Sequence, residues 1–356
     1  MKINIINKKQ KKTKLLVNSL LIIFFFISCK ETKLPDFVTG LNDTTENQIN
    51  APIQALKKVR FLPNWNLNSQ FAAYYVGKEL GFYKKKGIDL DILTYFPTKN
   101  LSEEFKKIKP DFSVLWLSNA LELNDKNNNL VNIAQFSNKS SIMMVTKKKS
   151  KINTLKDFNN KKAAIWSDFV NQAEVFFKQN NLNVEVVPIS NSLNIFYNDG
   201  VEIVNANYFD EFHSIINSGY KEDELNFFFL ADYNFNLLED GLYCNNILLK
   251  NDPKLCRNFV KATIESWEYV FKHKTESIDI IEKVMKANKK AFNRAHQIWM
   301  LNRFEEIYKD GIYIRTYLSE KDYNLNTNIL LKGKSINKII PYNDFFQPFS
   351  FKSEKE

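Results

Sequence analysis

The sequence predicts an α/β fold in which helices cover a parallel or mixed sheet. From Lys57 onward, short apolar runs alternate with amphipathic stretches, which is the pattern of strands followed by covering helices. After about residue 250 the stretches become long and amphipathic, which is typical of helices. About 300 residues follow the N-terminal region, enough for one large or two ordinary domains with their own cores.

The first expected strand is VRFLPNW, and a helix follows it. Asn68 or Ser69 can cap the start of this helix, and Gly81 suits its end. Helical spacing of the apolar residues places Phe71 and Tyr75 on its buried face. We expect the neighbouring Lys cluster, Lys84 to Lys86, to form a solvated turn.

The later elements continue the same alternation. The expected strands are IDLDIL, DFSVLWLS, SIMMVT, KAAIW, VEVVPIS and the start of VEIVNANYFDEFHSIINSG. The expected helices include QAEVFFKQNN and, after GLYCNNILLK, the segments KLCRNFVKATIESWEYVFKH, SIDIIEKVMKA and RAHQIWMLNRFEEIYKD.

Residues 1–28 have the pattern of a lipoprotein signal peptide. Six Lys residues precede an apolar run that is too short to span a bilayer and that stops at Ser28 and Cys29. Lipidation of Cys29 would hold the mature chain on a membrane of the bacterial cell envelope. An ordinary signal peptide or an anchor helix is the alternative. Residues 29–56 are polar and predict a lipidated flexible tether.

The charge pattern argues against a nucleic-acid partner. Removal of the six Lys residues with the signal peptide lowers the net charge from +10 to +4. The remaining Lys residues are scattered, and no Arg-rich stripe or nucleic-acid motif occurs. Cys244 and Cys256 could form a disulfide in an exported protein, but the sequence leaves this open. No Cys or His lies at metal-ligand spacing, so we expect no metal site.

No catalytic pattern stands out. The chain has nine Gly and lacks a Gly-rich phosphate loop. No Ser-His-Asp or Cys-His arrangement is evident, and His213, His273 and His296 each lie isolated in helical sequence. We therefore expect no catalytic residues and no cofactor.

The stretch NWNLNSQFAAYYVGKELGFYKKKGIDLDI at residues 64–92 resembles the opening of ABC-transporter solute-binding proteins of the thiamine-pyrimidine-precursor type, relatives of the sulfonate and taurine binders. Further matches follow in order: DFSVLW, SIMMVTKKKSKINTLKDFNNKKAAIWSDF, VEIVNANYFDEF, LLEDGLYCNN and FNRAHQIWML. The resemblance implies a two-lobed type II periplasmic-binding-protein fold with mixed sheets and a ligand cleft between the lobes. The first lobe would comprise residues 57–145 and 241–356, and the second 146–240.

The cleft of such a fold lies at the carboxyl ends of strands. Trp65 follows the first expected strand, so its ring could stack on a flat heteroaromatic ligand, or it could only pack the strand against the helix. Asn64 could donate and accept hydrogen bonds at the ligand's edge. Trp116 and Asn119 end another strand, and Trp166 could supply a second stacking face.

Three more residues complete the expected site. Asp168 follows Trp166, although it could serve only as a helix cap. Where the family usually has Tyr-Asn-Glu, this chain has Phe209, Asp210 and Glu211. We expect Glu211 to accept hydrogen bonds from an aminopyrimidine, and Asp210 in place of Asn puts the exact ligand in doubt. Tyr243 could line the cleft or the hinge.

The same fold also includes thiamine-pyrimidine synthases, which are enzymes. At the synthase's lysine and histidine positions this chain has Leu115 and Asn119, and neither can do that chemistry. The resemblance thus implies a monomeric, membrane-anchored solute-binding component of an ABC importer, which captures a thiamine pyrimidine precursor and docks on a permease. The alternatives are a synthase-like enzyme and a binder of another solute, such as riboflavin or a sulfonate.

Overall fold

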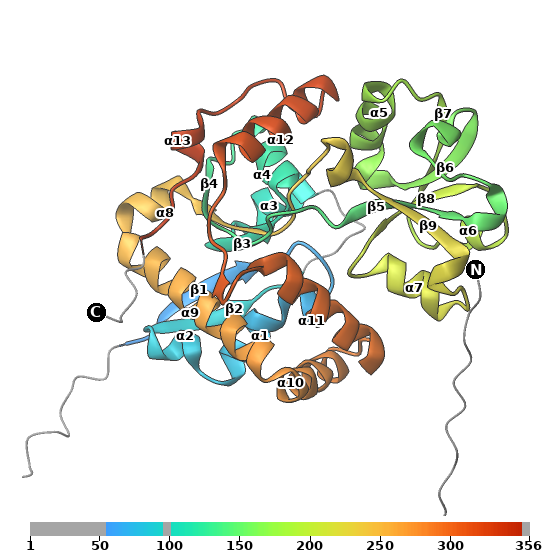
Figure 1. Ribbon diagram of the computed structural model, residues 1–356. Helices are drawn as coiled ribbons and strands as arrows, with labels where there is room; N and C mark the ends of the chain where they lie inside the picture. Colours follow the sequence, from blue (N-terminus) through green and yellow to red (C-terminus); the bar gives the residue numbers. More distant parts are fainter. Residues whose placement is uncertain (1–54, 95–100, 351–356) are drawn as a thin grey trace, which may run out of the picture. The chain divides into compact units, whose positions relative to one another are not determined.

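The computed structural model describes residues 55–94 and 101–350. The expected signal peptide, Cys29 and nearly all of the expected tether lie outside the described residues. Within them, two sheets form the centres of two lobes (Figure 1).

The first lobe is built on a five-stranded mixed sheet with the order β2-β1-β3-β10-β4. Its strands are β1 (Lys57–Leu62), β2 (Ile88–Ile92), β3 (Phe112–Leu115), β4 (Leu130–Gln135) and β10 (Gly241–Asn245). β1 pairs in parallel with β2 and β3, whereas β10 runs antiparallel to β3 and β4. A strand from late in the sequence thus completes the sheet.

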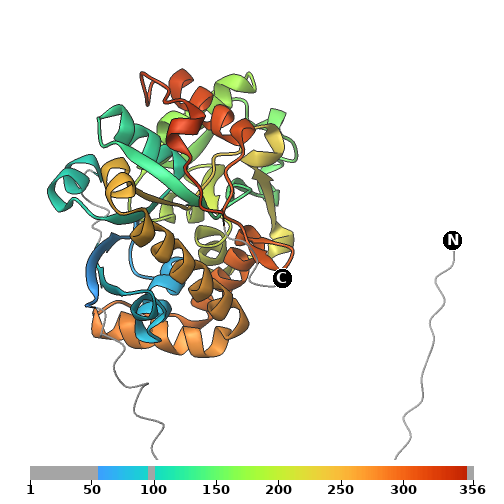
Figure 2. The same cartoon turned by 90° about the vertical axis from the view of Figure 1, so that its left-hand side faces the viewer.

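Helices from both parts of the sequence cover this first sheet. They are α1 (Ala72–Glu79), α2 (Phe82–Lys85), α3 (Leu101–Ile108), α4 (Leu117–Asp125), α8 (Asn246–Asn251), α9 (Pro253–Lys272), α10 (Lys274–Ala287), α11 (Arg294–Tyr308), α12 (Glu320–Lys332) and α13 (Tyr342–Phe345). A short hairpin, β11 (Lys309–Asp310) and β12 (Tyr313–Ile314), follows α11. The helices α9 and α10 lie against α1 (Figure 2).

The start and end of the first helical segment follow the expected capping pattern. The Asn68 side chain accepts a hydrogen bond from the Gln70 backbone N–H, at the start of a 3-10 turn (Ser69–Phe71) that leads into α1. Gly81 has a φ of +77°, a left-handed conformation that suits glycine. One detail differs from the expectation. Tyr74 is fully buried and stacks on Phe61 with ring centroids 4.0 Å apart, while Tyr75 is only partly buried.

The second lobe contains a five-stranded sheet with the order β7-β6-β8-β5-β9. Its strands are β5 (Ile142–Lys147), β6 (Lys161–Trp166), β7 (Val184–Ile189), β8 (Ile203–Asn207) and β9 (Leu225–Phe229), and its helices are α5 (Val170–Gln179), α6 (Asn194–Tyr197) and α7 (Glu211–Asn217). β6 is parallel to β7 and β8, and β5 is antiparallel to β8 and β9. β5 begins a few residues before the boundary that the sequence suggested at 146.

Two chain segments connect the lobes, residues 136–141 and 230–240. Glu239 joins them because its Oε1 accepts hydrogen bonds from the Ser141 backbone N–H at 2.7 Å and from the Ser140 hydroxyl at 3.1 Å. Asn236 adds a second link by accepting from the Ser140 backbone N–H at 2.7 Å. The two segments are therefore held together by side chains as well as by the sheets at either end.

The two cysteines in the described part of the chain are not joined by a disulfide bond. Cys244 in β10 and Cys256 in α9 are both buried free thiols, and their Sγ atoms lie 3.9 Å apart. This separation is almost twice a disulfide bond length.

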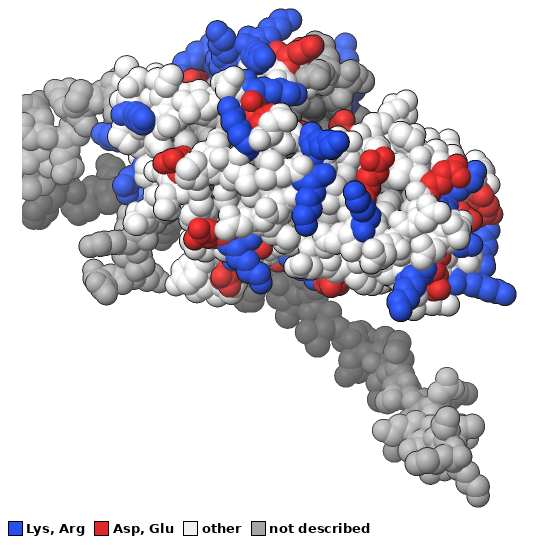
Figure 3. All heavy atoms as spheres, turned by 90° about the horizontal axis from the view of Figure 1, so that it is seen from above, with Lys and Arg blue, Asp and Glu red and all other residues white. Residues whose placement is uncertain are grey.

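Two further properties concern membrane-spanning helices and surface charge. No helix in the described ranges combines the length and apolar character needed to cross a membrane. On the face seen in Figure 3, basic and acidic side chains are interspersed. Together the two mixed sheets and their covering helices confirm the α/β prediction.

Candidate ligand-binding cleft

A cavity of about 1050 Å³ has walls from both lobes. Its lining includes these residues from the expected site: Asn64, Trp65, Trp116, Asn119, Trp166, Asp168 and Glu211. Their roles in binding stay predictions. The structure does bring them together around one space, large enough for a ligand of several rings.

Most of these residues lie where a strand ends. Asn64 and Trp65 follow β1, and Trp116 follows β3 and precedes the first residue of α4. Trp166 is the last residue of β6, and its backbone N–H donates to the Asn205 side chain at 2.8 Å. The carboxyl ends of these strands thus supply the indole rings of the cavity.

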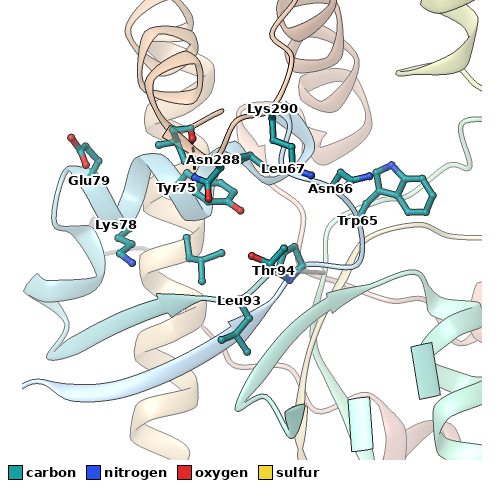
Figure 4. Close-up of a pocket in the computed structure, with 13 residues that line it drawn as sticks. Trp65, Asn66, Leu67, Tyr75, Lys78, Glu79, Leu93, Thr94, Asn288 and Lys290 are labelled. Atoms are coloured by element: carbon teal, nitrogen blue, oxygen red, sulfur yellow. Dashed lines mark hydrogen bonds between the residues drawn. The ribbon is translucent and has the colours of Figure 1, made fainter. Parts of the chain in front are cut away.

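Trp65 occupies the border between this cavity and a smaller hollow. The smaller hollow, of about 300 Å³, lies beside α1 and α10, and Tyr75, Leu93 and Lys290 also line it. Figure 4 shows the Trp65 ring pointing away from those side chains. With 38% of its surface exposed, Trp65 is not a core residue. This favours the stacking role over simple packing of strand against helix.

Three polar side-chain atoms on the cavity wall have no hydrogen-bond partner within the described part of the chain. They are Asn64 Oδ1, Trp166 Nε1 and Gln172 Oε1. Buried polar atoms of native proteins nearly always have a partner. Two acceptors and one donor beside indole rings are therefore suited to the polar edge of a bound molecule.

Glu211 lies at the start of α7 and is positioned by backbone. Its Oε2 accepts a hydrogen bond from the Asn207 N–H at 2.8 Å, at the end of β8. Burial, followed by the neighbouring Asp210 carboxylate, raises the pKa of Glu211 well above its usual range. A ligand that donates hydrogen bonds or carries positive charge would favour the ionised carboxylate.

The described cavity wall carries more acidic than basic groups. The carboxyl side chains are Glu122, Asp168, Asp210 and Glu211, whereas the single cationic side chain is Lys126. No Arg is among the described lining residues. Within the described ranges, no group of three or more His, Cys, Asp or Glu residues could hold a metal ion.

Tyr243 does not belong to this cavity wall. It is fully buried in β10, in a hydrophobic cluster with Phe345, and is not among the lining residues. The reason is the direction of the strand. Because β10 is antiparallel to β3, Gly241 at its beginning pairs with Leu115 at the end of β3. The residues that follow Gly241 therefore run away from the cleft edge.

Sequence reasoning missed Glu122 and Gln172. Gln172 of α5 approaches Glu122 of α4 across the lobes, with Nε2 3.5 Å from Oε1. Both residues lie inside helices rather than at strand ends, so the rule that located the Trp residues could not find them.

Two of the histidines that are isolated in the sequence lie together in the fold. His213 of α7 and His296 of α11 place their Nδ1 atoms 2.9 Å apart, although they are 83 residues apart in sequence. His296 Nε2 also lies 2.9 Å from Asp210 Oδ1, at the cavity wall. Only the tertiary fold brings α7 and α11 together, so no local pattern signals this pair.

The two positions that would identify a synthase were also located. Leu115 is fully buried in β3 and is not a lining residue, while Asn119 on α4 lines the cavity. Neither supplies an amine or an imidazole.

Comparisons with solved structures identify the fold. The sulfonate-binding protein SsuA from Escherichia coli aligns with a TM-score of 0.65 at 11% identity, covering 84% of this chain and 95% of that one. SsuA from Methylobacillus flagellatus KT gives 0.60 at 15% identity, covering 83% and 93%. The desulfurization enzyme DszB gives 0.52 at 10% identity, covering 82% and 96%. Binding proteins and an enzyme thus share this fold, which is the expected periplasmic-binding architecture.

A comparison with curated protein sequences found no match. A family model does match, over residues 68–277, which is more than half of the chain. The chain belongs to the NMT1/THI5-like family.

Proposed function

We propose that this chain is the membrane-anchored solute-binding component of an ABC importer and that it captures a thiamine pyrimidine precursor. The observation that carries the proposal is the cavity wall, where three Trp residues accompany polar atoms without partners. A flat heteroaromatic ring with donors and acceptors at its edge matches both features.

The binding mechanism follows from the two lobes. Stacking on the indole rings supplies affinity, and the polar atoms at the ligand's edge supply specificity. Because both lobes contribute walls, a ligand that contacts both stabilises the closed arrangement. The closed form would then dock on the permease. Lipidation of Cys29, the permease partner, the monomeric state and the location in the cell envelope all belong to this proposal.

A sulfonate ligand is less compatible with the cavity. Recognition of sulfonate or carboxylate groups commonly uses Arg, and the described lining has none. The four carboxyl side chains of the described wall also offer an anion no positive partner. The alkanesulfonate-binding protein from Xanthomonas axonopodis bound to MOPS shares the fold at 11% identity, and at this identity the likeness concerns the fold alone.

The enzyme alternative has its own direct test. Leu115 and Asn119 argue against synthase chemistry, but Lys126 offers an amine on the cavity wall. Incubation with pyridoxal phosphate should give no Schiff-base absorbance. An absorbance that disappears in Lys126→Met would favour the enzyme instead.

Native mass spectrometry of the full-length chain in detergent tests the proposed function. We expect a one-to-one complex after addition of an aminopyrimidine, and we expect Trp65→Ala to weaken it strongly. Phe227→Ala is a suitable control because Phe227 is also an exposed aromatic residue but does not line the cavity. Absence of any pyrimidine complex, or equal binding by Trp65→Ala, would contradict the proposal.

A further inference from the structure

A second group of acceptors lines the cleft, apart from Glu211. Glu122 comes from α4, and Gln172 and Asp168 come from α5 and the turn that precedes it. In Figure 1, α4 and α5 lie toward the upper end of the interlobe region, near α12, while α7 lies toward the lower end, near α11. The helix contacts of α12 with α4 and α5, and of α11 with α7, agree with this view.

Gln172 is the strongest sign that this group serves a ligand. Only 6% of its surface is exposed, and its Oε1 has no hydrogen-bond partner among the described residues. Its Nε2 is 3.5 Å from Glu122 Oε1, at the outer limit of a hydrogen bond. A buried amide that leaves one side unpaired and reaches across the cleft is costly unless something else binds it.

No ion pair within the described residues involves the carboxyl groups of this group of acceptors. Glu122 makes no ion pair with Lys126, one helical turn away, and Asp168 makes none with any described residue. Burial raises the pKa of Glu122 to about 7; the Lys126 charge and a hydrogen bond from Ser335 oppose this rise, and the Asp168 charge adds to it. The group therefore has more acceptor atoms than donors.

We infer that Glu122, Gln172 and Asp168 form a subsite for an ammonium group carried on a side chain of the ligand. An ammonium group offers three donors and one positive charge, and these three side chains offer acceptors from both lobes. The cavity of about 1050 Å³ has room for such a substituent beside an aromatic ring. This inference rests on the proposed function and specifies it: the ligand is an amine-bearing flat heterocycle.

Two aminopyrimidines that differ in one substituent, aminomethyl or hydroxymethyl, test the inference. Their Kd values are measured by calorimetry with the full-length chain in detergent, near neutral pH. We expect the aminomethyl compound to bind about tenfold more tightly, the scale of a charged hydrogen bond. Glu122→Gln should remove most of this preference, measured as the ratio of the two Kd values.

The matched control is Glu174→Gln, an exposed acid on α5 outside the cavity wall, which should keep the preference. If Glu122→Gln fails to fold, Asp168→Asn gives the same comparison. Equal affinities of the two compounds in the unaltered chain, or a preference that survives both substitutions, would overturn the subsite and leave the proposed function standing. If neither compound binds, the proposed function fails and the subsite fails with it.

Discussion

Glu211 presents its carboxyl group from a helix start, where the Asn207 N–H holds one oxygen at 2.8 Å. Glu211 lines the cavity, so its carboxyl group is placed to meet a ligand amino group. We predict that Glu211→Gln weakens binding of an aminopyrimidine by about 1–3 kcal/mol, because a charged acceptor becomes a neutral amide. Calorimetric titration measures the change.

The control for this change is Glu222→Gln, since Glu222 is an exposed acid of the second lobe that does not line the cavity. It should bind as tightly as the unaltered chain. An unchanged affinity in Glu211→Gln would refute the assigned role.

Single residues also show where sequence reasoning worked and where it failed. Trp65, Trp116 and Trp166 could be located because parallel strands end at the same sheet edge, so a residue just after a strand is a cleft candidate. Tyr243, expected to line the cleft or the hinge, lies off the cavity wall because the direction of β10 depends on pairing with strands more than a hundred residues earlier. Gln172 lies inside a helix, where burial and a missing partner appear only in three dimensions.

At the scale of the elements, Glu239 links the two segments that connect the lobes, residues 136–141 and 230–240. Burial raises the pKa of its carboxyl group to about 8, against an ordinary value near 4.5. The ionised form is therefore disfavoured in the folded chain. The penalty is absent below the unfolded pKa, grows as the pH rises from about 4.5 to about 8, and is complete above that value.

We predict that Glu239→Gln flattens the pH dependence of stability. The amide oxygen can still accept from the Ser141 N–H, but the side chain no longer titrates. In the unaltered chain, the free energy of unfolding should fall between about pH 5 and pH 8, and the variant should lose much less over that range. Urea unfolding at several pH values measures both profiles. Parallel profiles would show that Glu239 does not titrate in this window.

The elements themselves were largely predictable from the sequence, because strand runs such as KAAIW and helix stops such as Gly81 are local signals. The link that Glu239 makes between the two connecting segments was not predictable, because a Glu followed by an Asp in a loop normally predicts solvent exposure. Its burial depends on Ser140 and Ser141, about a hundred residues earlier.

At the scale of the whole molecule, α11 of the first lobe contacts α7 of the second. Trp299 donates to the Tyr208 carbonyl at 3.0 Å and stacks on His213, with ring centroids 4.9 Å apart. Arg303 donates to the Tyr208 hydroxyl at 2.7 Å. The contact between His213 and His296 lies within this interlobe surface, so the charge of the His213 ring bears directly on lobe separation.

We predict that the lobes separate as the pH falls. Burial, followed by the neighbouring His296, lowers the pKa of His213, whereas Asp210 acts in the opposite direction. The neutral ring thus stabilises the contact above the ordinary His pKa of about 6.5, and this stabilisation is lost as the pH drops from there toward the lowered value. Below it, a cationic His213 ring would lie with its Nδ1 atom 2.9 Å from Nδ1 of His296. Spin labels on Cys residues introduced at Lys178 and Lys250, both exposed, can measure the distance between lobes in a Cys29→Ser background.

The distance between the two spin labels should lengthen between about pH 7.5 and pH 5, and His213→Gln, which cannot become charged, should show no such change. A distance that is independent of pH in the unaltered chain, or an equal lengthening in His213→Gln, would exclude the histidine pair as the cause.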